Sequence, residues 1–217
     1  MIRNFTRAFT LIELLIVIAV VAILATIAYP VFIGIEEKAK ITKDMNNLRQ
    51  IGIATQLYLN DNDGAFPGSP TVAWMGQLHP KYLAAWNIFQ SPFDTRPPSE
   101  AGTAAPVSPI SYGINGNNIV GTSADNISNA SIFILFAPAQ ASGATVSFQG
   151  TALTAAPGVT VLQATSPGGP AIGGTNSSRQ KISALFADLH LENMTWSVFI
   201  NNINSASDPS AAQRWSP

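Results

Sequence analysis

Few residues of this chain could carry acid–base, nucleophilic or metal chemistry. Its 217 residues include two histidines and no cysteine, so it has no thiolate nucleophile and no disulfide, and a transition-metal site is not expected. His190 follows Asp188 by two residues, and with one of the many serines this pair could supply a Ser–His–Asp triad. Because both residues belong to one predicted tight turn, we interpret them as turn and surface hydrogen-bonding groups. We likewise interpret His79, which precedes Pro80, as a loop residue, and we predict no catalytic residue and no enzyme activity.

The segment NDNDGAFPGSP contains closely spaced acids that could begin a calcium-binding loop. Asp61, Asp63 and Gly64 match the start of an EF-hand loop, but Val72 occupies the position that requires a bidentate acid. Clusters of Asn, Asp, Gly and Pro also end helices, and we interpret the segment as such a turn. These residues predict no cofactor and no metal site.

A further acid, Glu13, lies inside an otherwise apolar segment. Residues 11–35 contain no other charged residue. An ionised carboxylate within a bilayer costs about 3 kcal/mol or more, so it needs a partner or a route to water. Because Glu13 is near the start of the segment, it could be protonated or could reach the aqueous interface; alternatively, it pairs with a cation.

The segment that holds Glu13 is long enough to cross a membrane. As a helix, residues 11–35 extend about 37 Å, against a hydrocarbon core of about 30 Å. Arg3 and Arg7 precede the segment without any acid, which predicts a cytoplasmic N-terminus and an exported remainder. A secretory signal peptide has a shorter apolar core followed by a small-residue cleavage site, so an uncleaved anchor is the simpler interpretation.

The residues RAFTLIEL and the apolar run after them resemble the class III signal of type IV pilins and type II secretion pseudopilins. In that family a prepilin peptidase cuts before the apolar run, and the new N-terminus is methylated. The resemblance implies cleavage between Ala8 and Phe9, N-methylation of Phe9, and Glu13 as the family's acid at the fifth mature position. Ala8 stands where the family usually has glycine.

The resemblance also implies a role for Glu13 in assembly. Its carboxylate could pair with the positive amine that cleavage creates at Phe9, in the same subunit or a neighbour, and so set the axial register of a filament. The implied partners are identical or related pilin subunits, prepilin peptidase, an inner-membrane assembly platform and, before assembly, membrane lipid. The implied location is the bacterial inner membrane, with a cytoplasmic N-terminus and an extracytoplasmic head, and then a periplasmic or cell-surface filament. A net charge of −1 with 11% charged residues indicates no nucleic-acid partner.

Beyond the apolar segment, the helical pattern continues into an amphipathic half. Pro30 is expected to kink or loosen the helix, and Gly34 to add local flexibility. A single helix of about 75 Å is predicted from about Thr10 to Leu59. The residues of its predicted core-facing stripe are Ile41, Met45, Leu48, Gly52, Thr55 and Leu59. The charged residues placed away from this stripe are Glu36, Glu37, Lys38, Lys40, Lys43, Asp44 and Arg49.

The rest of the chain predicts a β-rich head. Residues 132–136, 145–149 and 159–163 have the composition of strands between turns, and residues 181–196 predict two strands around a turn at Asp188 and Leu189. Residues 74–100 predict a short helix or turn, a strand and a Pro-rich loop. Three short segments, QSPFD, ISYGING and FADLHL, resemble a subgroup of pseudopilin-like proteins, although Leu189 replaces the subgroup's usual glycine. Some major secretion pseudopilins bind calcium in a loop, but the ligands of that loop cannot be assigned in this chain.

We therefore predict an α+β, type IV pilin-like fold in which a long N-terminal helix packs on an antiparallel β-sheet head. Its predicted parts are a leader peptide (1–8), a transmembrane or filament-core helix (9–35), an amphipathic helix (36–60) and the head (61–217). The predicted function is that of a structural filament subunit, most like a type II secretion pseudopilin. A surface or DNA-uptake pilus stays open, and so does an uncleaved, membrane-anchored enzyme or binding domain.

Overall fold

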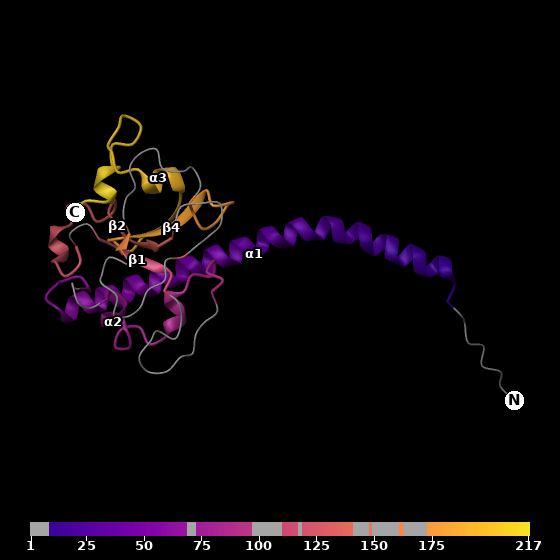
Figure 1. Ribbon diagram of the computed structural model, residues 1–217, viewed down its shortest axis with the longest axis horizontal. Coiled ribbons are helices and arrows are strands. Elements are labelled where there is room, and N and C mark those ends of the chain that lie inside the picture. The colour runs from indigo at the N-terminus through magenta and orange to yellow at the C-terminus, as the bar shows by residue number, and fades with distance from the viewer. Residues whose placement is uncertain are drawn as a thin grey trace. The chain divides into compact units, whose positions relative to one another are not determined.

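The computed structural model of this protein describes residues 9–68, 73–96, 110–116, 119–140, 148, 161–162 and 173–217. The chain divides into two compact units, Met1–Ala39 and Lys40–Pro217. Helix α1 (Leu11–Asp61) contributes its apolar first part to the first unit and its amphipathic second part to the second unit (Figure 1). The prediction of one long helix is confirmed.

The end of α1 is a tight turn, as the Asn- and Asp-rich segment after it predicted. Asp63 and Gly64 have left-handed backbone conformations, with φ of 53° and 74°. The Gly64 amide donates to the Leu59 carbonyl at 2.9 Å, which is the bond that closes a Schellman-type helix end. Asp61 forms an ion pair with Lys81 at 2.7 Å. These residues therefore stop the helix and attach its end to the surface of the head.

The second unit is built on a five-stranded sheet with the order β3-β1-β2-β4-β5. Its strands are β1 (Tyr112–Asn115), β2 (Ile134–Pro138), β3 (Val161–Leu162), β4 (Lys181–Phe186) and β5 (Leu191–Thr195). Every pairing is antiparallel except that of β1 with β3, which is parallel. The other described helices are α2 (Trp74–Leu78), α3 (Trp196–Ile200) and the 3-10 turns η1 (Trp86–Phe89), η2 (Ala124–Asn126) and η4 (Ala212–Arg214). This is the α+β fold that the sequence predicted.

Two hydrophobic clusters cover the two faces of this sheet. One joins α1, through Leu48 and Ile51, to α2 and to Leu185 of β4. The other contains Ile182 of β4, Trp215 and residues of α3, and α1 and α3 lie on opposite sides of the sheet (Figure 1). Neighbouring side chains of β4 thus enter opposite clusters, as the two-residue repeat of a strand requires. Because both faces are covered, every residue of β2 is buried.

The predicted strands are confirmed where the structure describes them, with one correction. The hairpin of β4 and β5 is present, and the strand expected at 132–136 is β2, displaced by two residues. Of residues 159–163, Val161–Leu162 are described as β3; of residues 145–149, Phe148 is described and bridges to Gln140. The described residues 73–96 contain no strand; the apolar run there forms η1, because one tight turn brings Trp86 and Phe89 together into the α1 cluster. The predicted Pro-rich loop at 97–99 lies outside the described residues.

The core-facing stripe of α1 is confirmed in part and corrected at Asp44. The residues buried as predicted are Leu48, Gly52, Thr55 and Leu59. Ile41 and Met45 are only half-buried, whereas Asp44, predicted for the polar face, is fully buried. Asp44 precedes Leu48 by four residues, so it occupies the same face of the helix one turn earlier. Its position along the helix, rather than its charge, decides where its side chain lies.

Candidate functional site

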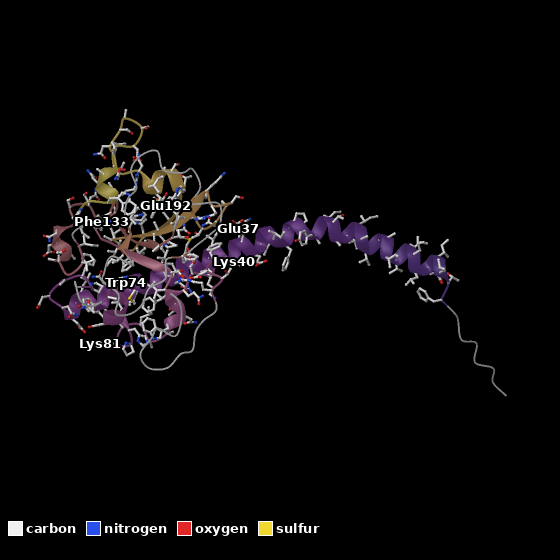
Figure 2. The ribbon with its side chains drawn as sticks, in the orientation of Figure 1. Glu37, Lys40, Trp74, Lys81, Phe133 and Glu192 are labelled. Carbon is white, nitrogen blue, oxygen red and sulfur yellow. The ribbon has the colours of Figure 1, made fainter. Side chains whose placement is uncertain are left out.

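The first part of α1 presents an apolar surface that no part of the described chain covers. All residues from Phe9 to Glu36 are exposed, and the large apolar side chains from Phe9 to Ile35 are 48–81% exposed. One helix, α1, is long and apolar enough to cross a membrane, with a mean hydropathy of 3.0 over its most apolar window. In the head, by contrast, Trp74 and Phe133 lie in the interior (Figure 2). An apolar surface of this size needs lipid or other protein as its environment.

Glu13 takes part in a capping box at the start of this helix. The helix begins at Leu11, so Thr10 is its N-cap and Glu13 its third residue. Glu13 Oε2 accepts the Thr10 amide at 2.9 Å and the Thr10 hydroxyl at 2.7 Å. The Glu13 amide in turn donates to Thr10 Oγ1 at 3.3 Å. Two amides at the helix start thereby gain partners, and a negative charge lies where the helix dipole favours it.

The capping role of Glu13 was not predicted; the alternatives expected from the sequence for this acid were protonation, contact with the aqueous interface and pairing with a cation. The pattern Thr10-Leu11-Ile12-Glu13, followed by an apolar run, is the sequence signature of a capping box and was available. Phe9 is 74% exposed and directly precedes the cap, whereas Ala8 lies outside the described residues. Cleavage, methylation and the pairing of Glu13 with an amine at Phe9 remain predictions.

The two residues expected to loosen the helix, Pro30 and Gly34, both lie within continuous helix. A Cβ atom added at Gly34 would meet no atom within 4 Å, so nothing is packed against this position. The apolar side chains that surround a shallow groove here are Leu24, Ile27, Ala28, Val31, Phe32 and Ile35. They recur every three or four residues and therefore share one side of the helix. A kink at Pro30 remains a prediction.

The Asp188–His190 pair lies in an exposed turn, as expected. His190 Nδ1 lies 2.5 Å from Asp188 Oδ1, and the His190 amide donates to the same oxygen at 3.1 Å. The His190 ring stacks on Phe186, with centroids 4.1 Å apart. No serine hydroxyl is among the hydrogen-bond partners of this pair in the described part of the chain. The contacts organise the hairpin turn.

His79, the other histidine, stacks on Trp86 with ring centroids 4.2 Å apart. Among residues 9–68, 73–96, 110–116, 119–140 and 173–217, no group of three or more His, Asp or Glu side chains could hold a metal ion.

A second set of polar side chains brings together the segments QSPFD and ISYGING. Ser91 Oγ and the Tyr112 hydroxyl each donate to Asp44 Oδ1 at 2.7 Å. Nearby, Ser111 Oγ donates to Asp94 Oδ2 at 2.6 Å. We call Asp44 together with Ser91, Tyr112 and Ser183 the Asp44 cluster. The structure thus gives the two motif segments a shared role, which is to bind the buried acid of α1.

Comparisons with known proteins agree with the N-terminal geometry. Residues 3–29 match the family model described as the prokaryotic N-terminal methylation motif. Over 57 residues, the chain is 40% identical to the type IV major pilin protein PilA of Myxococcus xanthus (strain DK1622). This similarity covers 26% of this chain and 26% of that protein, so the match spans about a quarter of the curated relative's length. No solved structure matches the chain.

The methylation motif, the long apolar helix and the sheet packed on the helix's second half occur together in one chain. The chain therefore carries the prokaryotic N-terminal methylation motif at residues 3–29 and is similar, over about a quarter of its length, to a type IV major pilin.

Proposed function

We propose that this protein is a structural subunit of a type IV pilus-like filament and assembles through the first part of α1. The observation that carries the proposal is the uncovered apolar part of α1, residues 11–35, whose only acid, Glu13, lies within the methylation motif. In the membrane, lipid would cover this surface; in a filament, equivalent helices of other subunits would cover it instead. The head would then form the outside of the filament.

We propose a processing step before assembly. A prepilin peptidase cuts between Ala8 and Phe9, and the new amine of Phe9 is methylated. Arg3 and Arg7 hold this end in the cytoplasm, and an inner-membrane platform moves the mature subunit into the filament. The exposure of Phe9 immediately before the helix cap is compatible with access by such an enzyme.

This proposal is compatible with two types of filament. The short QSPFD, ISYGING and FADLHL segments favour a type II secretion pseudopilin, because they resemble that subgroup. The similarity of 57 residues to a type IV major pilin favours a surface pilus. Deleting the gene distinguishes them: loss of protein secretion with no change in surface filaments supports the pseudopilin, and the opposite result supports the pilus.

The capping box suggests how one acid can serve both in lipid and in a filament. Thr10 satisfies Glu13 Oε2, while Oε1 accepts no hydrogen bond from the described residues. A neighbouring subunit's Phe9 amine could therefore reach Oε1 without displacing Thr10. The carboxylate would then cap its own helix and bind the next subunit at the same time.

The test separates these two roles of Glu13. Gln is also accepted at the third position of a capping box, so Glu13→Gln keeps the cap and removes the charge, whereas Glu13→Ala removes both. We expect both variants to be processed but to assemble few or no filaments in cells. Amide hydrogen exchange at the helix start should stay slow in Glu13→Gln and become faster in Glu13→Ala. If the Glu13→Gln variant assembled filaments normally, the charge-pairing role of Glu13 would be contradicted, and capping of the helix would be its one remaining role.

A separate measurement tests the filament class as a whole. Mass spectrometry of the N-terminal peptide from native cells should find a free, methylated Phe9. An intact leader in those cells would instead support the uncleaved, membrane-anchored domain.

A further inference from the structure

The Asp44 cluster is buried inside the head and connects three parts of the fold. Asp44 belongs to α1, Tyr112 to β1 and Ser183 to β4, and Ser91 lies in the turn after η1. The cluster therefore joins the helix to two strands of the sheet that are not neighbours, since β2 lies between them. Because the whole cluster lies within the head, its chemistry does not depend on the proposed filament function.

One oxygen of Asp44 is well bonded and the other is not. Oδ1 accepts hydroxyl hydrogens from Ser91 and Tyr112, each at 2.7 Å. Oδ2 and Ser183 Oγ are both buried, and neither has a partner of normal hydrogen-bond geometry. The two side chains are nevertheless close enough for the Ser183 hydroxyl to lower the pKa of Asp44. A hydrogen bond between these two atoms can form in two ways: Ser183 Oγ donates to an ionised Oδ2, or a protonated Oδ2 donates to Ser183 Oγ. Only the second leaves this buried pocket without a charge.

In the described part of the head, the groups that contact Asp44 are neutral. Its contacts are the hydroxyls of Ser91, Tyr112 and Ser183. A fully buried carboxylate without a cation is costly, because neutral hydroxyls replace only part of its hydration. Burial accordingly raises the pKa of Asp44, and the three hydroxyls lower it by less. Burial and the nearby acid raise the pKa of Tyr112 well above its usual range, so its hydroxyl stays a neutral donor.

The charged groups on the surrounding elements do not neutralise Asp44. After Ser91, Asp94 pairs with Arg96 at 2.6 Å. On α1 itself, Lys40 lies one turn before Asp44 and is half-buried, but it is not among the groups that shift the pKa of Asp44. On β4, Lys181 is exposed at the start of the strand. Among the residues that the structure describes, the partners of Asp44 are thus hydroxyls.

We propose that Asp44 is a neutral carboxylic acid in the folded head, and that rising pH removes its proton and weakens the attachment of α1 to the sheet. In the neutral form, Oδ2–H donates to Ser183 Oγ, and Oδ1 accepts from Ser91 and Tyr112. In the ionised form, the same pocket holds an unpaired charge at the helix–sheet contact. The head is then a pH-sensitive unit that is held together best in mildly acidic surroundings.

The direction of the pH effect follows from proton binding. In the unfolded chain, Asp44 loses its proton near pH 4; in the folded head, it keeps the proton to a higher pH. Between these two values the folded state binds more protons, so the free energy of unfolding falls as pH rises. The stabilisation that the Asp44 proton provides is fully present below about pH 4, and it is lost as pH rises through the raised pKa. The contribution of Asp94 to the free energy of unfolding instead rises with pH, because its pKa is lowered in the folded head. It does so at lower pH than the contribution of Asp44 changes.

The first experiment measures denaturant unfolding of the full chain in a non-ionic detergent, followed by tryptophan fluorescence, from pH 5 to pH 9. The wild-type unfolding midpoint should move to lower denaturant as pH rises. In Asp44→Asn, which copies the shape of the neutral acid, the midpoint should change much less over this range. Asp94→Asn is the matched control: it also removes a buried acid, but it should keep the wild-type pH dependence. Equal pH dependence in wild type and Asp44→Asn would overturn the proposal.

The second experiment detects the proton directly and does not require Asp44→Asn to fold. As pH rises from 4, the infrared spectrum of the wild-type protein should keep a protonated-carboxyl C=O band after the bands of ordinary carboxyls have disappeared, and this band should itself disappear at higher pH. Tyr112→Phe removes a donor to Oδ1, so the loss of this band should move to higher pH. The absence of the band, or a band that Tyr112→Phe does not move, would contradict a neutral Asp44.

Discussion

Leu189, in the turn between β4 and β5, has a φ of 70°, which a leucine adopts only at a cost of about 1 kcal/mol. The side chain is half-buried against α1, since a Cβ added at Gly52 would lie 3.1 Å from Leu189 Cδ2. The packing of the side chain offsets the backbone strain. This position therefore tests how much of the hairpin depends on turn conformation and how much on contact with the helix.

At position 189, glycine should give a more stable head than alanine, which is the reverse of their usual order of stability. Leu189→Ala keeps the strain and loses the packing, whereas Leu189→Gly loses the packing but relieves the strain. We expect the glycine variant to be more stable than the alanine variant by about 1 kcal/mol, measured by denaturant unfolding. The control is Ala187→Gly in the same turn, where φ is not positive and glycine should destabilise. A less stable Leu189→Gly than Leu189→Ala would contradict the strain argument.

Two acids on α1 also show how differently the chain satisfies a carboxylate. Glu13 is exposed and bound by Thr10, its own helix cap. Asp44 is fully buried and bound by hydroxyls from distant segments. The first arrangement needs four consecutive residues, while the second needs the folded head.

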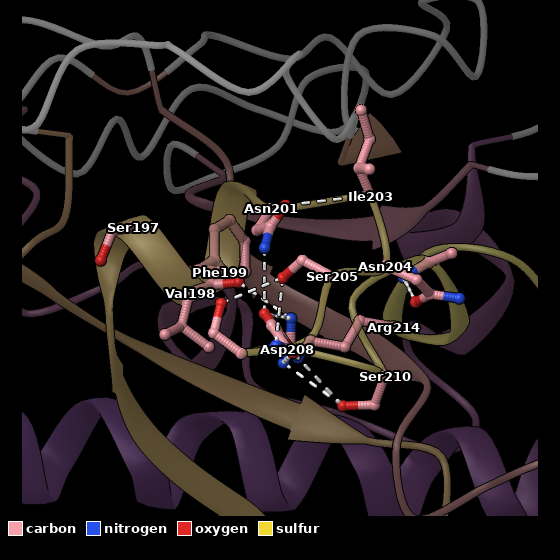
Figure 3. A network of polar contacts seen from close by, with 12 residues as sticks. Ser197, Val198, Phe199, Asn201, Ile203, Asn204, Ser205, Asp208, Ser210 and Arg214 are labelled. Carbon is pink, nitrogen blue, oxygen red and sulfur yellow. Dashed lines mark hydrogen bonds and ion pairs between the residues drawn. The ribbon is translucent and has the colours of Figure 1, made fainter.

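At the scale of elements, the C-terminal segment is attached by an ion pair rather than by a disulfide. Arg214 donates to both oxygens of Asp208, at 2.5 and 2.9 Å, and also to the Val198 carbonyl of α3 at 3.2 Å. Asn201 donates to the same acid at 3.1 Å, and Figure 3 shows these groups converging between α3 and the terminal segment. The side chains of Arg214 and Asp208 are only 9% and 16% exposed. A chain without cysteine thereby holds its last residues on the sheet.

Breaking this ion pair should destabilise the head, and the loss of stability should be larger at neutral pH than at acidic pH. The Arg214 bonds lower the pKa of Asp208, so the stabilisation is present above about pH 4 and is lost as pH falls through the lowered pKa. We expect Arg214→Met to cost about 2 kcal/mol at pH 7, because Asp208 loses a bidentate partner. Denaturant unfolding at pH 7 and pH 3 should show a smaller difference from wild type at the lower pH.

The matched control for this prediction is the exposed pair of Lys81 and Asp61. Their side chains are 66% and 51% exposed, and water screens such pairs. Lys81→Met should therefore change stability less than Arg214→Met. An equal loss in both variants would mean that burial does not strengthen the C-terminal pair.

At the scale of the whole molecule, the division into two units predicts that the head can fold without the apolar helix. The second unit begins at Lys40, and its part of α1 contributes Leu48, Ile51 and Leu59 to the core. A chain that starts at Lys40 should be monomeric without detergent and should keep its tryptophan fluorescence and cooperative unfolding. Size-exclusion chromatography and denaturant unfolding measure this result.

A shorter chain provides the comparison. Starting at Asn62 removes Leu48 and Ile51, which are fully buried, and leaves the sheet face uncovered; this chain should aggregate or unfold without cooperativity. If the chain from Lys40 behaved in the same way, the head would depend on the apolar helix.

Much of the fold followed from local patterns. The apolar run, the amphipathic repeat and the Asn- and Asp-rich turn predicted α1 and its end, and the FADLHL segment predicted the β4–β5 hairpin. Thr10 and Glu13 are only three residues apart, so the local sequence could also have predicted this cap, although it did not enter the prediction. The strand β1 and its parallel pairing with β3 were not predicted. Pairing between segments that are distant in sequence produces no characteristic pattern in the residues of either segment.

By itself, then, the sequence determined the features that depend on residues a few positions apart: an apolar helix, a capped acid within a methylation motif, a helix-ending turn and a hairpin. Only the tertiary structure decided where Asp44 lies and what surrounds it. Its burial depends on the whole face of α1, and its partners come from two strands and a turn that are distant in sequence. A charged residue is usually placed on the surface, and the contacts that reverse this placement exist only once the helix is packed on the sheet.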